Sequence, residues 1–285
     1  MKEDAIFVDV DDVRLRVHVQ GDGPPIYAHH GAPGLGTHAT PAKAFGPLAD
    51  AYRIVTFDAR GSGASGAVPP YTHERWVADL DGLREAFGDE RIVLTGGSYG
   101  GYVALEYVLA HPERVSHLIL RDTSASHRFE AAARRNALAR ADEFPEIDEE
   151  LLDRLFSGRV GSDAEFARGF AAIAPLYDAD YDPEKVAARV RSATFRAETH
   201  NAAFSRNMPG FDLTGRLNEI RVPTLITVGR HDWITPVAAS EELAAGIAGS
   251  ELVIFEASGH SPQLEENERF IAVVRDFLER HGGAG

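Results

Sequence analysis

The sequence predicts an α/β fold with a mostly parallel sheet of about eight strands, flanked by helices and interrupted by an all-helical cap. Three observations support this prediction. Short apolar runs alternate with amphipathic helical patterns between residues 26 and 121. From about residue 123 to residue 220 the alternation is replaced by helical periodicity in a stretch rich in alanine, arginine and glutamate. The alternation of strand and helix patterns then resumes at Val222.

The expected strands are short runs of β-branched and apolar residues bounded by turn residues. They comprise residues 6–10, 13–19, 26–29, 53–58, 91–95, 115–121, 223–228 and 251–255. The expected helices comprise residues 37–49, 74–87, 99–110, 129–144, 149–156, 164–173, 183–204, 237–247 and 266–280. The simplest organisation is a core made of residues 1–122 and 221–285, with the helical cap formed by residues 123–220.

The composition narrows the classes of function. The 285-residue chain carries a net charge of −15 and contains no cysteine. Disulfides, thiolate catalysis and cysteine-ligated metals are therefore excluded, and the negative charge disfavours nucleic acid and anionic membrane surfaces. The apolar runs are of strand length and the N-terminal residues lack a secretory apolar region. We expect a cytoplasmic monomer or small homo-oligomer with no nucleic-acid or membrane partner.

A glycine-rich turn carries the strongest sign of chemistry. Residues 96–100 read Gly-Gly-Ser-Tyr-Gly, which fits the pattern G-x-S-x-G. The motif directly follows the expected strand 91–95 and directly precedes the expected helix 99–110. A serine at such a strand-to-helix turn is exposed at the edge of the sheet, and glycines are needed around it because side chains would collide there. Ser98 is therefore the predicted nucleophile of a hydrolase.

A serine nucleophile needs a base, and the base needs an acid that orients it. The chain order typical of this turn is serine, acid, histidine. His260 is the predicted base because it lies in the loop between the last strand and the last helix. Asp232 is the predicted acid because it follows the strand 223–228, although Asp122, which follows the strand 115–121, is an alternative.

An oxyanion hole requires two backbone amides, one from the residue after the nucleophile and one from a loop after an early strand. Tyr99 supplies the first amide. Residues 29–34, His-His-Gly-Ala-Pro-Gly, form the second loop, with Ala32 as the expected donor. No carboxylate lies at ligand spacing from the adjacent histidines, so we expect no metal here and assign His30 to supporting the loop by hydrogen bonding.

A second glycine pattern is a poor candidate for cofactor binding. Residues 61–66, Gly-Ser-Gly-Ala-Ser-Gly, satisfy G-x-G-x-x-G after a strand. A dinucleotide site also requires a helix to begin at that point. The segment 67–70, Ala-Val-Pro-Pro, does not begin a helix of that kind. The expected chemistry needs no cofactor.

These motifs together resemble those of the proline iminopeptidase family of α/β-hydrolases. That family typically carries His-Gly-Gly-Pro-Gly, Asp-x-Arg-Gly-x-Gly-x-Ser and Gly-Gly-Ser-Trp/Tyr-Gly-Gly. The corresponding segments here are residues 30–34, His-Gly-Ala-Pro-Gly, residues 58–65, Asp-Ala-Arg-Gly-Ser-Gly-Ala-Ser, and residues 96–101, Gly-Gly-Ser-Tyr-Gly-Gly. The resemblance implies an α/β-hydrolase fold with a helical cap, in which acidic residues hold the free amino terminus of the substrate.

Carried onto this chain, the resemblance implies that Glu198, in a segment similar to a Glu-Asn-His segment of the family's cap, binds the substrate amine. This chain differs from the family's pattern at two positions. Ala32 replaces the second glycine of the first motif, and Trp233 stands where some relatives have a glutamate for the amine. Gly31, Glu198 and Trp233 are the predicted substrate-binding residues.

The sequence therefore predicts a serine hydrolase that acts through Ser98, Asp232 and His260, with a short peptide or an amino-acid amide or ester as substrate. A carboxylesterase or lactonase with the same residues is the alternative enzyme, favoured by Trp233 and the missing second acidic residue. A non-catalytic ligand-binding protein of the same fold is the alternative from another class.

Overall fold

The structure is a computed structural model that describes residues 6–282. Its centre is an eight-stranded sheet with the order β1-β2-β4-β3-β5-β6-β7-β8. The strands β1 and β2 pair antiparallel, β2 pairs antiparallel with β4, and all later neighbours are parallel. The strands are β1 Ile6–Val10, β2 Val13–Gln20, β3 Pro25–His29, β4 Arg53–Phe57, β5 Ile92–Gly97, β6 Val115–Arg121, β7 Thr224–Gly229 and β8 Glu251–Phe255. The predicted fold class is confirmed.

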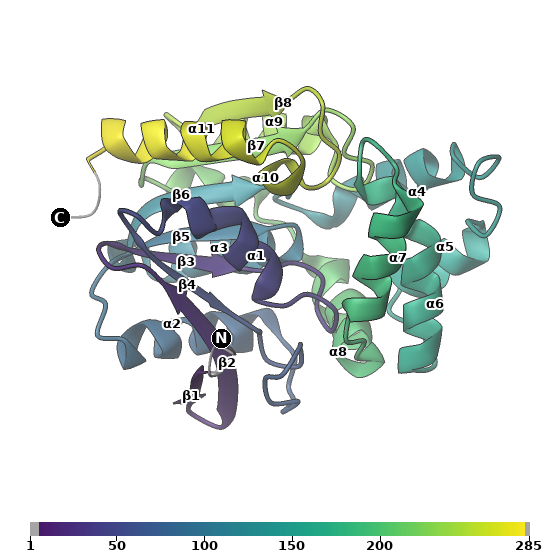
Figure 1. Ribbon diagram of the computed structural model, residues 1–285, viewed down its shortest axis with the longest axis horizontal. Coiled ribbons are helices and arrows are strands. Elements are labelled where there is room, and N and C mark those ends of the chain that lie inside the picture. The colour runs from purple at the N-terminus through teal and green to yellow at the C-terminus, as the bar shows by residue number, and fades with distance from the viewer. Residues whose placement is uncertain (1–5, 283–285) are drawn as a thin grey trace.

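Helices cover both faces of this sheet (Figure 1). On one face, α2 (His73–Ala86), α3 (Tyr99–Ala110) and α9 (Val237–Gly246) contribute apolar side chains to a large buried cluster. On the other face, α1 (Ala39–Phe45) and α11 (Asn267–Arg280) contribute to a second cluster. The central strands are apolar on both sides, as expected for a parallel sheet that is covered by helices on both faces.

The chain between β6 and β7 is helical. It contains α4 Glu130–Leu138, α5 Glu149–Phe156, α6 Asp163–Ile173, α7 Pro183–Ser192 and α8 Ala197–Ala202. Figure 1 shows these helices grouped beside the carboxyl ends of the parallel strands. They enclose an apolar cluster of their own, to which Trp233 of the loop after β7 also belongs. We refer to residues 130–202 as the helical segment. Its position places it over the edge of the sheet where ligands bind in open α/β folds.

The helical segment departs from the sequence-based prediction at two places. The expected helix 183–204 is broken between α7 and α8, because Ala193 adopts an extended conformation. The amide of Arg196 donates to the carbonyl of Gly34 at 2.8 Å, so a tertiary contact replaces a helical hydrogen bond. The expected helix 129–144 ends at Leu138 and continues as a series of turns.

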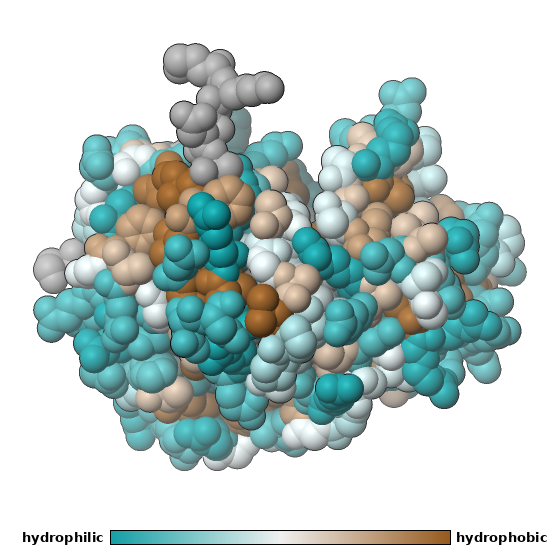
Figure 2. Space-filling model, turned by 90° about the horizontal axis from the view of Figure 1, so that it is seen from below, coloured by the Kyte–Doolittle hydropathy of each residue, from teal (hydrophilic) through white to brown (hydrophobic). Residues whose placement is uncertain are grey.

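The surface is mostly hydrophilic on the face seen in Figure 2, with hydrophobic residues gathered over part of it. Among the described residues, the exposed large hydrophobic side chains are Ile6, Phe7 and Tyr181. Within residues 6–282 we find no helix with the length and hydropathy that crossing a bilayer would require.

Candidate active site

Ser98 occupies the turn between β5 and α3. Its backbone has φ 53° and ψ −125°, a conformation that residues with a side chain rarely adopt. The amide of Ser98 donates to the carbonyl of Arg121 at 2.9 Å, and the Thr123 hydroxyl donates to the carbonyl of Ser98 at 2.8 Å. Contacts with β6 and the residues after it therefore hold the strained turn in place. This is the geometry of a nucleophile elbow.

The loop after β3 lies directly against this turn. A Cβ atom added to Gly31 would lie 2.8 Å from Cβ of Ser98, and one added to Gly100 would lie 2.3 Å from the carbonyl oxygen of His30. Neither distance leaves room for a side chain. The glycines at these two positions therefore allow the backbone of the loop to approach the serine.

The residues of the two predicted oxyanion amides, Tyr99 and Ala32, line the same cavity as Ser98. Tyr99 is the first residue of α3, so its amide has no acceptor within the helix. Ala32 has φ 51°, and its carbonyl accepts from the amides of Leu35 and Gly36 at 3.0 and 2.7 Å in a tight turn. The left-handed backbone at Ala32 explains in physical terms why a glycine is suited to this position.

His30 supports the same loop. Its Nδ1 donates to the carbonyl of Gly31 at 2.6 Å, and its Nε2 accepts from the amide of Ala59 at 2.9 Å. One nitrogen donates and the other accepts, which is the pattern of a neutral imidazole. Burial lowers the pKa of His30, in agreement with that neutral state. His30 thus supports the loop by hydrogen bonding, as expected from the sequence.

His260 and Asp232 form the hydrogen-bonded pair of the site. Nδ1 of His260 lies 2.8 Å from Oδ2 of Asp232, and both side chains are buried. Since a carboxylate only accepts, Nδ1 carries the proton and Nε2 presents a lone pair in the neutral ring. The carboxylate is held by the hydroxyl and amide of Thr235 at 2.7 and 3.0 Å and by the amide of Ile234 at 2.9 Å. This network fixes the tautomer and the orientation of the imidazole.

The loop that carries His260 is held from two sides. The Glu265 carboxylate accepts from the amides of Gly259 and Ser261 at distances between 2.9 and 3.1 Å. The amide of His260 donates to the carbonyl of Tyr177 at 2.8 Å, and the two rings meet edge to face at 5.2 Å. The helical segment therefore contributes to positioning the imidazole.

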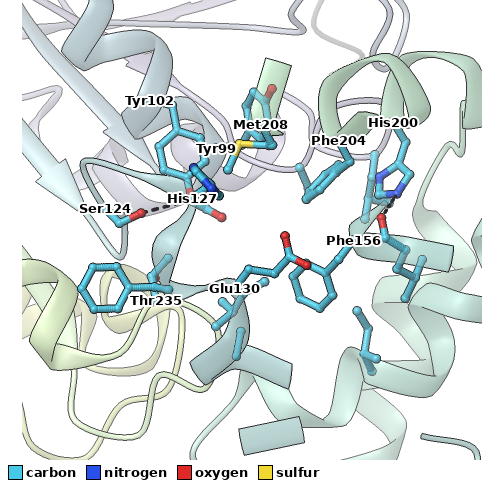
Figure 3. Close-up of a pocket in the computed structure, with 18 of the residues that line it drawn as sticks. Tyr99, Tyr102, Ser124, His127, Glu130, Phe156, His200, Phe204, Met208 and Thr235 are labelled. Carbon is cyan, nitrogen blue, oxygen red and sulfur yellow. Dashed lines mark hydrogen bonds between the residues drawn. The ribbon is translucent and has the colours of Figure 1, made fainter. Parts of the chain in front are cut away.

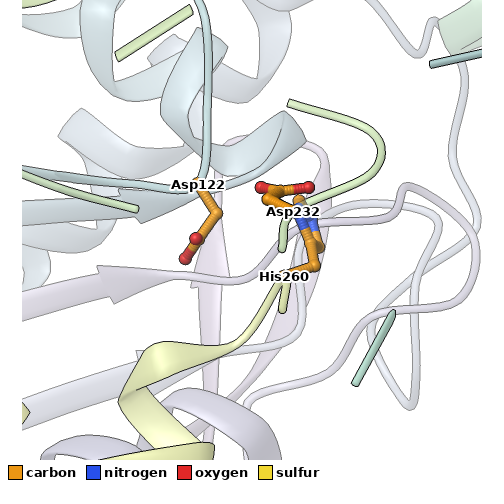
Figure 4. A group of neighbouring side chains, drawn as sticks. All are labelled: Asp122, Asp232 and His260. Carbon is orange, nitrogen blue, oxygen red and sulfur yellow. The ribbon is translucent and has the colours of Figure 1, made fainter. Parts of the chain in front are cut away.

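Asp122 lies beside this pair, at the end of β6 (Figure 4). One side-chain nitrogen or oxygen atom each of Asp122, Asp232 and His260 lies within 4.8 Å of the others. Such spacing could suit a metal ion, but Nδ1 of His260 is already engaged by Asp232. Burial raises the pKa of Asp122 well above its usual range, and the negative charge of Asp232 raises it further. The carboxylate that is hydrogen-bonded to His260 is that of Asp232.

Two cavities meet at Ser98. The smaller one, of about 100 Å³, is enclosed mainly by aromatic and aliphatic side chains of α3 and the helical segment (Figure 3). The larger one, of about 360 Å³, is also lined by His260 and by Gly31 and Ala32 of the loop after β3. Among the described residues, Ser98 and His260 make no direct hydrogen bond, as is common before a substrate tightens such a site.

A family model described as "alpha/beta hydrolase fold" matches residues 24–267. The chain belongs to the α/β-hydrolase family. It is 36% identical over 278 residues to the proline iminopeptidase PfmaB of Pestalotiopsis fici, covering 96% of this chain and 99% of that protein. It is 31% identical over 287 residues to a proline iminopeptidase of Neisseria gonorrhoeae, with 91% and 90% covered.

A solved esterase of Thermogutta terrifontis is 26% identical to this α/β-hydrolase, covers 98% of this chain and 99% of its own, and superposes with a TM-score of 0.76. Together with the residue-level geometry, these similarities identify the chain as a serine hydrolase that resembles the proline iminopeptidases.

Two of the predicted substrate-binding residues of this α/β-hydrolase lie away from the cavities. Glu198, in α8, is exposed and lines neither cavity at Ser98. Trp233 is buried one layer behind the wall, where its ring meets Tyr177 at 5.6 Å and Phe156 at 6.3 Å. Gly31 lines the larger cavity, next to Ser98. The structure thus brings Gly31 to the site and does not bring Glu198 to it.

The segment 61–66, which carries the second glycine pattern, supports the loop after β3. Gly61 and Gly63 have positive φ, and no helix follows until His73. The hydroxyl of Ser62 accepts from the amide of Gly34 at 3.0 Å, and the Asp58 carboxylate accepts from the amide of Ala64 at 2.8 Å. The bond of Ser62 connects the segment to the loop that carries Ala32, and the bond of Asp58 stabilises the segment itself.

Sequence reasoning missed Glu130, at the start of α4, which among residues 6–282 is the one carboxylate that lines the smaller cavity. Glu130 is one of many glutamates in an Ala-, Arg- and Glu-rich stretch, and nothing in its spacing distinguishes it. Only the packing of α4 against the core identifies it as a residue of the site.

Proposed function

We propose that this α/β-hydrolase cleaves short peptides, amino-acid amides or amino-acid esters that have a free amino terminus, by acyl transfer through Ser98. The observation that carries the proposal is the Asp232–His260 hydrogen bond of 2.8 Å in the cavity that Ser98 lines. It leaves Nε2 of His260 as a base for the serine. The resemblance to proline iminopeptidases supports the choice of substrate.

The proposed reaction has two steps. His260 takes the proton of the Ser98 hydroxyl as the oxygen attacks the carbonyl carbon, and the imidazolium then protonates the leaving amine or alcohol. Water, deprotonated by His260, next attacks the acyl-enzyme and releases the acid. The amides of Tyr99 and Ala32 bind the oxyanion in both steps, with each donor worth about 3 kcal/mol. Asp232 stabilises the imidazolium throughout.

A small-ester or lactone hydrolase is the second candidate. The smaller cavity is predominantly apolar, and Glu198 lies outside both cavities, which favours a neutral acyl group. The similar solved structure from Thermogutta terrifontis is an esterase. The same three residues would perform this reaction without change.

A panel of matched substrates tests the proposal. Alanine p-nitroanilide, N-acetylalanine p-nitroanilide and p-nitrophenyl propionate differ in the free amine and in the scissile bond. We expect measurable kcat/KM on alanine p-nitroanilide and a large loss when its amine is acetylated. Turnover of the propionate ester alone would overturn the aminopeptidase proposal in favour of the esterase. Turnover of none, with no labelling by a fluorophosphonate, would favour a ligand-binding protein.

A further inference from the structure

The wall of the smaller cavity has an unusual distribution of charge. Among the described residues that line it there is one acidic side chain, Glu130, and no lysine or arginine. Figure 3 shows the Glu130 carboxylate directed into the space between Phe156 and the Tyr99–Tyr102 side of the cavity. Ser98 lines the same space. A carboxylate thus lines the same mainly apolar pocket as the nucleophile.

Glu130 is only partly neutralised by a neighbour. Nε of Arg134 donates to Oε1 of Glu130 at 2.9 Å, and within residues 6–282 Oε2 has no hydrogen bond to a protein group. The guanidinium of Arg134 stacks on the ring of Phe156 at 5.2 Å and does not line the cavity. One oxygen of the carboxylate therefore remains available to a ligand.

Other polar groups of the cavity can accept hydrogen bonds from a ligand. Nδ1 of His127 donates to the carbonyl of Phe211 at 3.0 Å, which leaves Nε2 of the neutral ring as an acceptor. The Ser124 hydroxyl donates a hydrogen bond to the carbonyl of Ser126 at 2.8 Å. The buried hydroxyl of Ser126 has no partner in the described part of the chain. Acceptors in the same cavity as a carboxylate suit an ammonium group, which has three donors and no acceptor.

The aromatic side chains reinforce that preference. The cavity is bounded by the rings of Phe129, Phe156, Phe166, Phe170, Tyr177 and Phe204. Ring faces attract a cation, and the attraction is strongest where water is excluded. The same rings accept an apolar substituent carried next to the charged group.

We propose that Glu130 is the residue that binds the substrate's ammonium group, and that the smaller cavity holds the N-terminal residue on the acyl side of the scissile bond. This inference rests on the proposed function and assigns its amine recognition to a residue of α4 in place of Glu198. The leaving group then occupies the larger cavity, which is lined by His260. Glu130 sets specificity, and the bond-breaking steps remain those of Ser98 and His260.

The test compares two benzyl esters, of alanine and of propionic acid, which differ only in the ammonium group. Glu130→Gln keeps the size of the side chain and removes its charge. We expect kcat/KM for the alanine ester to fall by about 10- to 100-fold, which is the range for a lost charged hydrogen bond. The propionate ester should change by less than about threefold, since it has no group for the carboxylate.

Two control variants separate recognition from structure. Glu198→Gln changes an exposed glutamate of α8 and should leave both esters unaffected. Arg134→Gln breaks the same ion pair from the other side while it keeps the carboxylate, so the preference for the alanine ester should be kept or increased. If Glu130→Gln and Arg134→Gln slow both esters equally, the role of the pair is structural and the inference is wrong.

The outcome for the wild-type protein distinguishes a failure of the proposed function from a failure of the assignment of Glu130. If it prefers the propionate ester, the aminopeptidase proposal itself fails. If it prefers the alanine ester and Glu130→Gln keeps that preference, the proposed function stands and the assignment of Glu130 is overturned. A dissociation constant for n-propylamine, measured by titration calorimetry, gives a readout without turnover, and we expect it to rise in Glu130→Gln alone.

Discussion

At the scale of single residues, the two aspartates beside His260 are distinguished by their environment. Asp232 receives hydrogen bonds from His260 and from Thr235, whereas one oxygen of Asp122 is buried and has no partner among residues 6–282. The structure thus supports Asp232 over the alternative, Asp122.

We expect Asp232→Asn to lower kcat by about 10³- to 10⁴-fold, because an amide cannot hold the same tautomer of the imidazole. Asp122→Asn should remain within about tenfold of the wild type. Hydrolysis of p-nitrophenyl propionate measures both, and the reverse order of losses would identify Asp122 as the acid.

The raised pKa of Asp122 also predicts how stability depends on pH. Above the ordinary pKa of an aspartate the unfolded chain has lost its proton, while the folded protein retains it because the pKa is raised by burial. The folded state therefore loses stability as pH rises through the window between the two values. Asp122→Asn removes this loss, so its melting temperature should gain on the wild type from pH 4 towards pH 8. The exposed Asp180→Asn should show no such trend, and a parallel shift in both variants would contradict the account.

Ala32 provides a third test at this scale. Its φ of 51° costs little for glycine and is a true outlier for a β-branched residue. Ala32→Gly should keep kcat within about threefold of the wild type, while Ala32→Val should lower it by about 100-fold or more through a displaced oxyanion donor. Circular dichroism of both variants checks that the fold is retained. Equal activity in Ala32→Val would show that this loop does not contribute a donor.

At the scale of secondary-structure elements, a buried ion pair connects the loop after β4 with α2. Arg60 is fully buried and donates through Nε and Nη2 to both oxygens of Asp79 at 2.7 Å. We expect Arg60→Met to lower the free energy of unfolding by about 3–5 kcal/mol, because it leaves the Asp79 carboxylate buried without its partner. Urea denaturation measures the loss. The double variant Arg60→Met/Asp79→Leu should recover part of it, and no recovery would mean that the arginine contributes mainly through packing.

The ends of a helix or strand were predicted correctly where residues within or next to that element determine them. Helix α5 coincides with the predicted range because Asp148 caps it by accepting from the amide of Leu151, and its apolar residues share one face. The break between α7 and α8 could not be predicted in the same way. It depends on the contact between Arg196 and Gly34, which are far apart in the sequence.

The residues of the site also divide into those that the sequence could predict and those that depend on tertiary packing. Ser98, Asp232 and His260 could be proposed from the sequence because strand ends of a parallel sheet meet at one edge, so their order along the chain is informative. Glu130 and the exposed position of Glu198 depend on how the helical segment packs, and a short similar motif did not carry that information.

At the scale of the whole molecule, the net charge of −15 favours the approach of cations. Added salt screens that attraction. We expect kcat/KM for the alanine ester to fall about two- to fivefold between low and physiological ionic strength, while the neutral propionate ester is unaffected. Equal salt dependence for both esters would show that long-range charge does not act on the substrate.

Ser98, at the end of β5, is the residue at which the fold, the Asp232–His260 pair and the two cavities meet. The most direct test of that convergence is covalent labelling with a fluorophosphonate, followed by mass spectrometry of the peptides. We predict one adduct per chain on the peptide that contains Ser98, and none in Ser98→Ala. An adduct on another residue, or no adduct on a folded and active protein, would contradict the assignment of Ser98 as the nucleophile.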